Sequence, residues 1–135
     1  MTVQLSTAVR NARLDAIETT IGTSAILKIR TGAQPANCAA ADSGTVLATL
    51  NLPSDYMAAA ASGAKAKSGT WEDTSADATG TAAHFRLYAS DGTTCHAQGT
   101  VTLTAGGGDM TVDNTSFASG QAFTVTSFTL TDGNA

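Results

Sequence analysis

The sequence predicts an all-β protein, a jelly-roll-like two-sheet β-sandwich with a short N-terminal α-helix. Three observations support this class. Apolar and polar residues alternate after residue 22, turn signals recur about every eight to twelve residues, and only 13% of the residues are charged although 42% are hydrophobic. The length of 135 residues suits one β-domain. We therefore divide the chain into an arm and helix at residues 1–22 and a β-sandwich domain at residues 23–135.

Residues 6–22 carry the helical pattern. Ser6 or Thr7 can cap the N-terminus of this helix, and Gly22 can end it. Two apolar stripes and one polar side run along the helix: Leu5, Val9, Ala12 and Ala16; Leu14, Ile17 and Ile21; and Asn11, Asp15, Glu18 and Thr19. A helix that packs on one sheet needs only one apolar stripe. Two interpretations follow, a wide amphipathic helix on its own domain or a second stripe that docks on another subunit.

The first half of the β-domain contains two clear strands and one ambiguous segment. We expect strands at 25–30 and 45–52, separated by a loop at 33–44 in which Pro35 cannot donate a hydrogen bond to a sheet. The segment 56–71 is ambiguous, because its alanines permit a helix whereas its glycines and alternating lysines favour weak strands.

The strand pattern is clear from residue 82 onward, with strands expected at 82–89, 94–105, 109–113 and 122–132. In the last strand, Phe123 and Val125 have one parity, whereas Phe128 and Leu130 have the other. A bulge near residues 126–127 would bring all four to one face. The alternative is a strand buried on both faces, and either arrangement suits a two-sheet sandwich.

The hairpin at residues 82–103 contains both histidines and one of the two cysteines. A two-residue turn at Asp91-Gly92 would pair Tyr88 with Cys95 and leave neither face apolar. A three-residue turn with a left-handed Gly92 pairs Ala89 with Thr93 and separates an apolar from a polar face. We predict the second register. Its apolar face is Phe85, Leu87, Ala89, Cys95, Ala97, Val101 and Leu103, and its polar face is His84, Arg86, Tyr88, Thr94, His96 and Gln98.

This register determines which chemistry the hairpin can carry. Cys95 becomes a small core residue, and His96 points to the opposite face, so the two cannot form a nucleophile and its base. His96 lies across from Arg86 in this register, on a face that is solvated, interfacial or, as the sharper alternative, able to bind an anion. We predict that the protein is not an enzyme.

The remaining motifs predict no metal and no cofactor. Asp73, Ser75 and Asp77 have the spacing of the first ligands in a calcium loop, but Ala78 stands where that loop requires glycine and His84 where it requires glutamate. The acidic stretch is therefore read as a solvated connection.

Charge and hydropathy limit the partners. A net charge of −4 provides no basic surface for nucleic acid or an anionic membrane, and no apolar run is long enough to span a bilayer. The first apolar residues do not form a signal peptide, so we expect the chain to fold in a cytoplasm, where Cys38 and Cys95 stay reduced.

Four stretches, "ILKIRTGAQPA" (26–36), "SGTVLATLNL" (43–52), "ADATGTAAHFRLY" (76–88) and "TVTSFTLT" (124–131), together resemble small virion proteins of tailed bacteriophages. Such proteins commonly begin with a short alanine-rich helix and continue as Ala/Thr/Gly-rich β-structure. The resemblance implies a capsid decoration, or cement, protein of the virion that folds in the host bacterial cytoplasm. It implies binding to the major capsid protein outside an HK97-type shell, and self-association as a homodimer or homotrimer.

The alternative is a tail, neck or fibre component, or a β-sandwich module that binds carbohydrate or a receptor. For the assembly role, the apolar arm and helix and the polar hairpin face supply the candidate interface: Val3, Leu5, Val9, Leu14, Ile17, Arg86, Tyr88 and His96.

Overall fold

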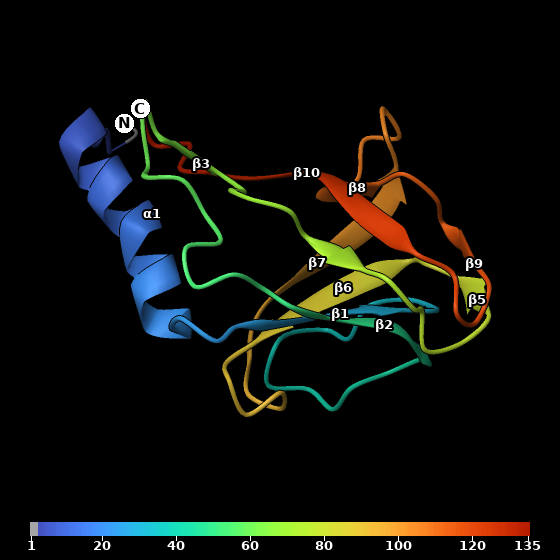
Figure 1. Ribbon diagram of the computed structural model, residues 1–135. Coiled ribbons are helices and arrows are strands. Elements are labelled where there is room, and N and C mark those ends of the chain that lie inside the picture. The colour runs from blue at the N-terminus through green and yellow to red at the C-terminus, as the bar shows by residue number, and fades with distance from the viewer. Residues whose placement is uncertain (1–2) are drawn as a thin grey trace.

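The computed structural model describes residues 3–135 as a mostly β protein with one N-terminal helix, which confirms that part of the prediction (Figure 1). Within these residues, no helix has the length and apolar character needed to cross a membrane. The elements are α1 (Thr7–Ile21), β1 (Ile26–Arg30), β2 (Val46–Asn51), β3 (Ala64–Ala66), β4 (Glu72–Asp73), β5 (Gly80–Thr81), β6 (His84–Tyr88), β7 (Cys95–Leu103), β8 (Met110–Val112), β9 (Ser116–Phe117) and β10 (Phe123–Thr131).

Eight of the strands form one mixed sheet in the order β2-β1-β6-β7-β8-β10-β3, and β4 pairs with β10 outside this path. The pair β7–β8 is parallel and the other pairs are antiparallel. β5 and β9 form a separate two-stranded sheet. Because β7 and β8 join what would be two sheets into one hydrogen-bonded path, the arrangement is not clearly the jelly-roll sandwich that we predicted from the sequence.

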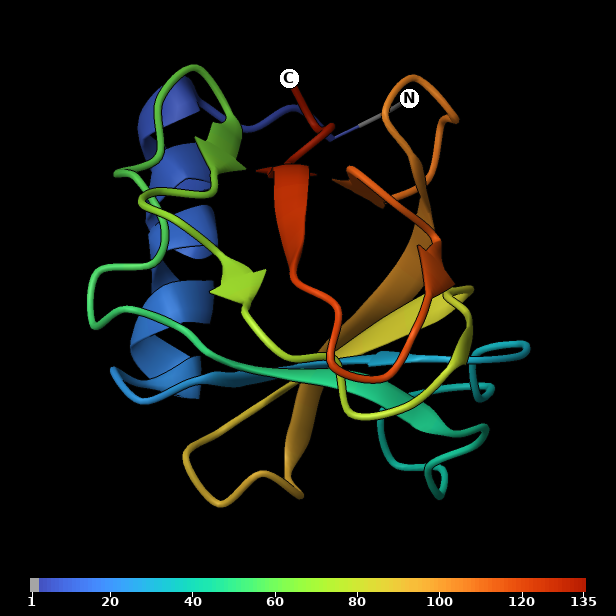
Figure 2. The same cartoon turned by 45° about the vertical axis from the view of Figure 1, so that its right-hand side comes forward.

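The main sheet curls around an aromatic core. β6 and β10 are separated in the sheet by β7 and β8, yet Phe85 of β6 and Phe128 of β10 meet edge to face with ring centroids 5.4 Å apart. The ring centroids of Trp71 and Phe128 are 5.7 Å apart. In both views, β10 lies above the core and β1 and β2 below it (Figures 1 and 2). Burying these rings contributes much of the folding free energy, since each fully buried aromatic removes about 150–250 Å² from water.

The helix α1 begins and ends as the sequence predicts. Ser6 caps it by accepting a hydrogen bond from the Val9 amide (3.3 Å), and Gly22 ends it with a positive φ of 94°. Leu14 and Ile21 are buried, and Ile17 packs partly against the core. The stripe of Leu14, Ile17 and Ile21 therefore docks on the helix's own domain, whereas Val9, Ala12 and Ala16 of the other stripe are exposed.

The predicted bulge in the last strand is confirmed. The register of β10 against β8 shifts between Val125 and Ser127, which leaves Thr126 as the extra residue. Phe123, Val125 and Phe128 are all buried, and Leu130 packs partly against the core. One inserted residue thus brings two parities of apolar side chains to the same face.

The turn of the β6–β7 hairpin differs from the prediction. The Ala89 amide donates to the carbonyl of Thr94 rather than pairing with Thr93 (3.0 Å), although Gly92 has the expected left-handed φ of 68°. The Asp91 carboxylate accepts hydrogen bonds from the amides of Thr93 and Thr94 (2.9 and 2.8 Å), which holds one more residue in the turn.

A bulge at His96 then restores the predicted parity for the rest of the hairpin. Leu87 pairs with Ala97, whereas Tyr88 pairs with Cys95, so one residue of β7 has no partner on β6. Two predictions are wrong as a result. Cys95 lies on the face of Arg86 and Tyr88 rather than on the apolar face, and Gln98, not His96, is across from Arg86.

Candidate functional site

The polar face of the hairpin is buried under the loop that joins β1 to β2. At its centre, Asp42 binds three side chains, and we call these four residues the Asp42 cluster. Arg30 Nη2 lies 2.7 Å from Asp42 Oδ2, Arg86 Nη1 contacts Asp42 Oδ1, and the Tyr88 hydroxyl donates to Asp42 Oδ1 (2.8 Å). Arg86 and Tyr88 are 1% and 0% exposed. The cluster is therefore an ion-pair network in which Arg30, Arg86 and Tyr88 are buried and the Asp42 side chain is 37% exposed.

Arg86 also holds the covering loop in place. Its guanidinium donates to the backbone carbonyls of Ala40 (3.1 Å), Cys38 (2.8 Å) and Asn37 (3.3 Å). Such a planar group with five donors suits this role, because it can satisfy an acid and several carbonyls at once. The sequence analysis did not predict that the loop covers Arg86, because the loop has no periodic pattern. The one signal in the sequence was Asp42, a single acid in an Ala/Ser-rich stretch.

The burial of Arg86 and Tyr88 overturns their predicted place on an accessible face. Neither side chain has the surface that a direct contact with a partner requires in this conformation. His84, on the same face, is 1% exposed, and its Nδ1 donates to the Gly32 carbonyl (2.7 Å) while Nε2 is buried with no partner among the described residues.

The titration of these groups follows from their contacts. Burial tends to raise the pKa of Asp42, but the Tyr88 hydroxyl and the two guanidinium groups outweigh burial and lower it. Burial and the hydrogen bond to Asp42 raise the pKa of Tyr88 to about 12. Burial lowers the pKa of His84. The cluster thus holds an ionised acid between two cations, which is an arrangement for holding a loop.

Cys95 lies beside this cluster and faces Cys38 from the covering loop. Their Sγ atoms are 2.9 Å apart, and the Cys95 thiol also contacts the Ala97 carbonyl oxygen (3.4 Å). Burial raises the pKa of Cys95 to about 11, with a further contribution from Cys38. His96 is exposed at the bulge. Because its pKa is about 11, the Cys95 thiol is protonated at neutral pH, which makes it a weak nucleophile.

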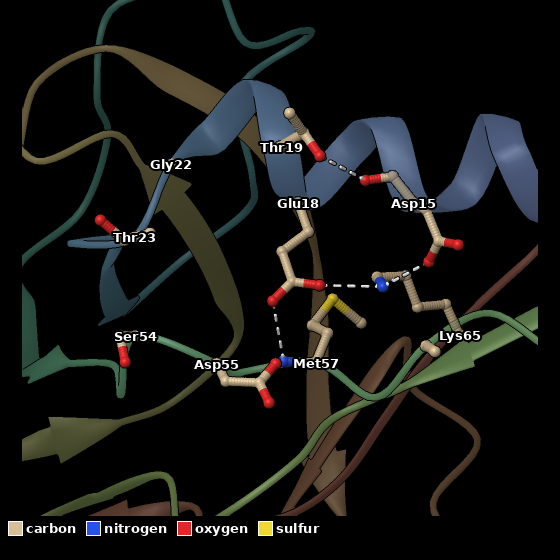
Figure 3. Close-up of a pocket in the computed structure, with 10 residues that line it drawn as sticks. Asp15, Glu18, Thr19, Gly22, Thr23, Ser54, Asp55, Met57 and Lys65 are labelled. Carbon is tan, nitrogen blue, oxygen red and sulfur yellow. Dashed lines mark hydrogen bonds and ion pairs between the residues drawn. The ribbon is translucent and has the colours of Figure 1, made fainter.

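A second group of charges joins α1 to the segment that contains β3. Lys65 is 2% exposed, and its Nζ lies 2.7 Å from Asp15 Oδ1 and 2.8 Å from Glu18 Oε2. These side chains line an open groove of about 550 Å³ (Figure 3). Burial tends to lower the pKa of Lys65, but the hydrogen bonds to Asp15 and Glu18 outweigh burial and raise it. The ammonium group stays charged and paired.

The polar side of α1 also makes backbone contacts with this segment. Asn11 Oδ1 accepts from the Gly63 amide (2.9 Å), Asp15 Oδ1 from the Ala60 amide (2.9 Å) and Glu18 Oε1 from the Met57 amide (3.4 Å). These three side chains satisfy the amides of an irregular segment that would otherwise be left unpaired. The groove therefore lies over the joint between the helix and the β-domain.

Substitution of Glu18 by glutamine is expected to lower the free energy of unfolding by about 1–2 kcal/mol, because a charged partner of a buried ammonium is lost while Asp15 remains. Denaturant unfolding at pH 7 measures the change. The matched control is Glu72→Gln on exposed β4, which is expected to change stability by less than about 0.5 kcal/mol. Equal effects of the two substitutions would contradict a structural role for the Glu18–Lys65 pair.

The other predicted interface residues are divided between core and surface. Leu14 is buried, and Leu5 is half-buried with its amide bonded to the Asn134 carbonyl (2.8 Å). Val3 and Val9 are 75% and 46% exposed. Ile17 and His96 come together in a shallow groove of about 250 Å³ that Arg13, Ala16 and Thr20 also line. The structure thus places Val9 on the outward side of α1, and Ile17 and His96 at the edge between the helix and the β-domain.

The outward side of α1 also carries Ala12 and Ala16, both exposed. We call the exposed residues Val9, Ala12, Arg13, Ala16 and Thr20 the outer helix face. It has one charged side chain and otherwise small or apolar ones. The first apolar stripe of the sequence analysis therefore faces away from the domain.

The described residues 3–135 contain no group of three or more His, Cys, Asp or Glu side chains that could hold a metal ion. The acidic stretch has a local use instead. Asp73 accepts from the amides of Ser75 (2.9 Å) and Thr49 (3.1 Å), and Asp77 accepts from the Thr49 hydroxyl (2.8 Å). These contacts fasten the chain around β4 to β2.

Comparison of the chain with protein-family models, with curated proteins and with solved structures found no match.

Proposed function

We propose that the chain is a non-enzymatic structural protein of a tailed-phage virion that binds the outer capsid surface and stabilises contacts between major capsid subunits. The observation that carries this proposal is the outer helix face, on which Val9, Ala12 and Ala16 are exposed and the one charged side chain, Arg13, is paired with Asp132 (3.1 Å). Small side chains lose little conformational entropy when a partner buries them, so many modest contacts can add up. Repetition on a lattice multiplies such contacts.

The internal use of the hairpin's reactive groups supports a role without catalysis. Asp42, Arg86 and Tyr88 hold a loop, and the thiol of Cys95 is protonated at neutral pH. The sequence resemblance to decoration proteins points the same way. As part of the proposal, the chain self-associates as a homodimer or homotrimer on an HK97-type shell. We also propose that its curled sheet is a jelly-roll-like sandwich, with the strands near β1 as one layer and those near β10 as the other.

The alternative of a carbohydrate-binding module is less well supported. Sugar recognition commonly uses exposed aromatic rings, but Trp71, Tyr56 and Tyr88, which are the tryptophan and both tyrosines of the chain, are each 0% exposed. The structure offers no observation that favours this second function.

Mixing the protein with undecorated HK97-type capsids is expected to give saturable binding and a higher capsid disruption temperature. An Ala16→Glu substitution on the outer helix face is expected to weaken binding roughly tenfold or more, because a partner would bury an unpaired carboxylate. Its unfolding temperature should stay at the wild-type value, since Ala16 is exposed.

The control is Ala118→Glu, the same substitution at an exposed position directly after β9. Figure 1 shows β9 at the far end of the molecule from α1. It should bind as the wild type does. Absence of wild-type binding would contradict the capsid role, whereas wild-type binding by Ala16→Glu would show that the outer helix face is not the contact surface.

A further inference from the structure

Cys38 and Cys95 come from distant parts of the chain and meet at the edge of the Asp42 cluster. They are 57 residues apart in sequence, yet their Sγ atoms lie 2.9 Å from each other. Cys38 belongs to the loop between β1 and β2, and Cys95 is the first residue of β7. Both residues are free cysteines of intermediate exposure.

Two independent features bring the thiols together. Arg86 holds the Cys38 backbone by donating from Nη2 to its carbonyl oxygen (2.8 Å). The bulge at His96 turns Cys95 onto the face of Arg86, since Tyr88 pairs with Cys95 while Leu87 pairs with Ala97. The two backbones are therefore fixed near each other by contacts other than the sulfurs themselves. A disulfide would need the sulfur atoms to approach by only about 0.9 Å, to its usual length of about 2.05 Å.

We propose that Cys38 and Cys95 form a reversible disulfide on exposure to a small-molecule disulfide, and that this bond locks the β1–β2 loop onto Arg86 and Tyr88 of β6. In the first step, the thiolate of one cysteine attacks the small disulfide, forms a mixed disulfide and releases one small thiolate. In the second, the other cysteine loses its proton and attacks the protein sulfur, which releases the second small thiolate. The protein loses two electrons and two protons, and the small disulfide is reduced to two thiols.

The surroundings of Cys95 set the conditions for this reaction. Because burial raises the pKa of Cys95 to about 11, its thiolate is scarce at neutral pH, and the rate of bond formation should increase with pH. A reducing cytoplasm keeps both thiols free, whereas an oxidising medium favours the bond. The bond and the loop form within one chain, so this inference does not depend on the proposed capsid role.

The test uses the purified full-length protein, reduced and then incubated with oxidised glutathione at pH 8. We expect both thiols to disappear from a thiol titration, the intact mass to fall by two hydrogen atoms, and a peptide map to show the 38–95 link in a monomer. The unfolding temperature should rise by on the order of 10 °C and return on treatment with dithiothreitol, since a long closed loop restricts the unfolded chain.

The matched controls are Cys38→Ser and Cys95→Ser, which should show neither the loss of two hydrogen atoms nor the rise in unfolding temperature. Three results would overturn the proposal: a wild-type protein that stays reduced, one that takes up glutathione or forms linked dimers without the internal bond, and one that forms the internal bond with no gain in unfolding temperature. The wild-type mass and peptide map decide the first two even if a serine variant does not fold.

Discussion

Substitution of Phe128 by alanine is expected to lower the free energy of unfolding by about 3–5 kcal/mol. The bulge at Thr126 places Phe128 on the same face of β10 as Phe123 and Val125. Phe128 is 4% exposed and contacts Trp71 and Phe85, so its loss would leave a cavity in the aromatic core. This cost is a large part of a typical total stability of about 5–15 kcal/mol.

Substitution of Thr126 by alanine, at the bulge of the same strand, is the control. It removes the hydroxyl contacts to Thr111 Oγ1 (2.7 Å) and Thr104 Oγ1 (3.0 Å) but keeps the register, so we expect a loss of only about 1 kcal/mol. Circular dichroism and denaturant unfolding compare the two variants. A Phe128→Ala variant with near-wild-type stability would contradict the role of this ring in the core.

Substitution of Asp42 by asparagine is expected to lower the free energy of unfolding by about 3 kcal/mol at pH 7. Arg30 and Arg86, 6% and 1% exposed, would remain buried without their acid. Breaking a buried ion pair from one side costs about 3–5 kcal/mol, and the 37% exposure of the Asp42 side chain places the expected loss at the lower end. Asp55→Asn, at an exposed position, is the control and should change stability by less than about 0.5 kcal/mol.

The pH dependence gives an independent check on Asp42. Its pKa in the folded chain is below its ordinary value of 3.8. A carboxyl with a lowered pKa contributes stability above its unfolded-state pKa and loses that contribution as the pH falls through the folded-state value. The wild type should therefore lose more stability below about pH 4 than Asp42→Asn does. Parallel stability curves for the two proteins would contradict a role for the ionised carboxylate.

The sequence by itself determined the features that depend on neighbours along the chain. Ser6 caps the N-terminus of α1, and Gly22 ends the helix with a positive φ. The parity change between Val125 and Phe128 predicted the bulge, because side-chain direction alternates strictly along a strand. The strands were found for the same reason, since alternation and turn residues are local signals.

Only the tertiary structure decided which groups came together across the chain. The register of the β6–β7 hairpin depends on its turn. The carboxylate of Asp91 holds a turn one residue longer than predicted, and the bulge at His96 compensates for the extra residue. Because of this bulge, Cys95 lies beside Cys38. The loop that contains Asp42 has no periodic pattern, yet it covers Arg86. Periodicity shows that a side chain faces one side of a strand, but whether that side meets water, a loop or a helix depends on segments far away in sequence.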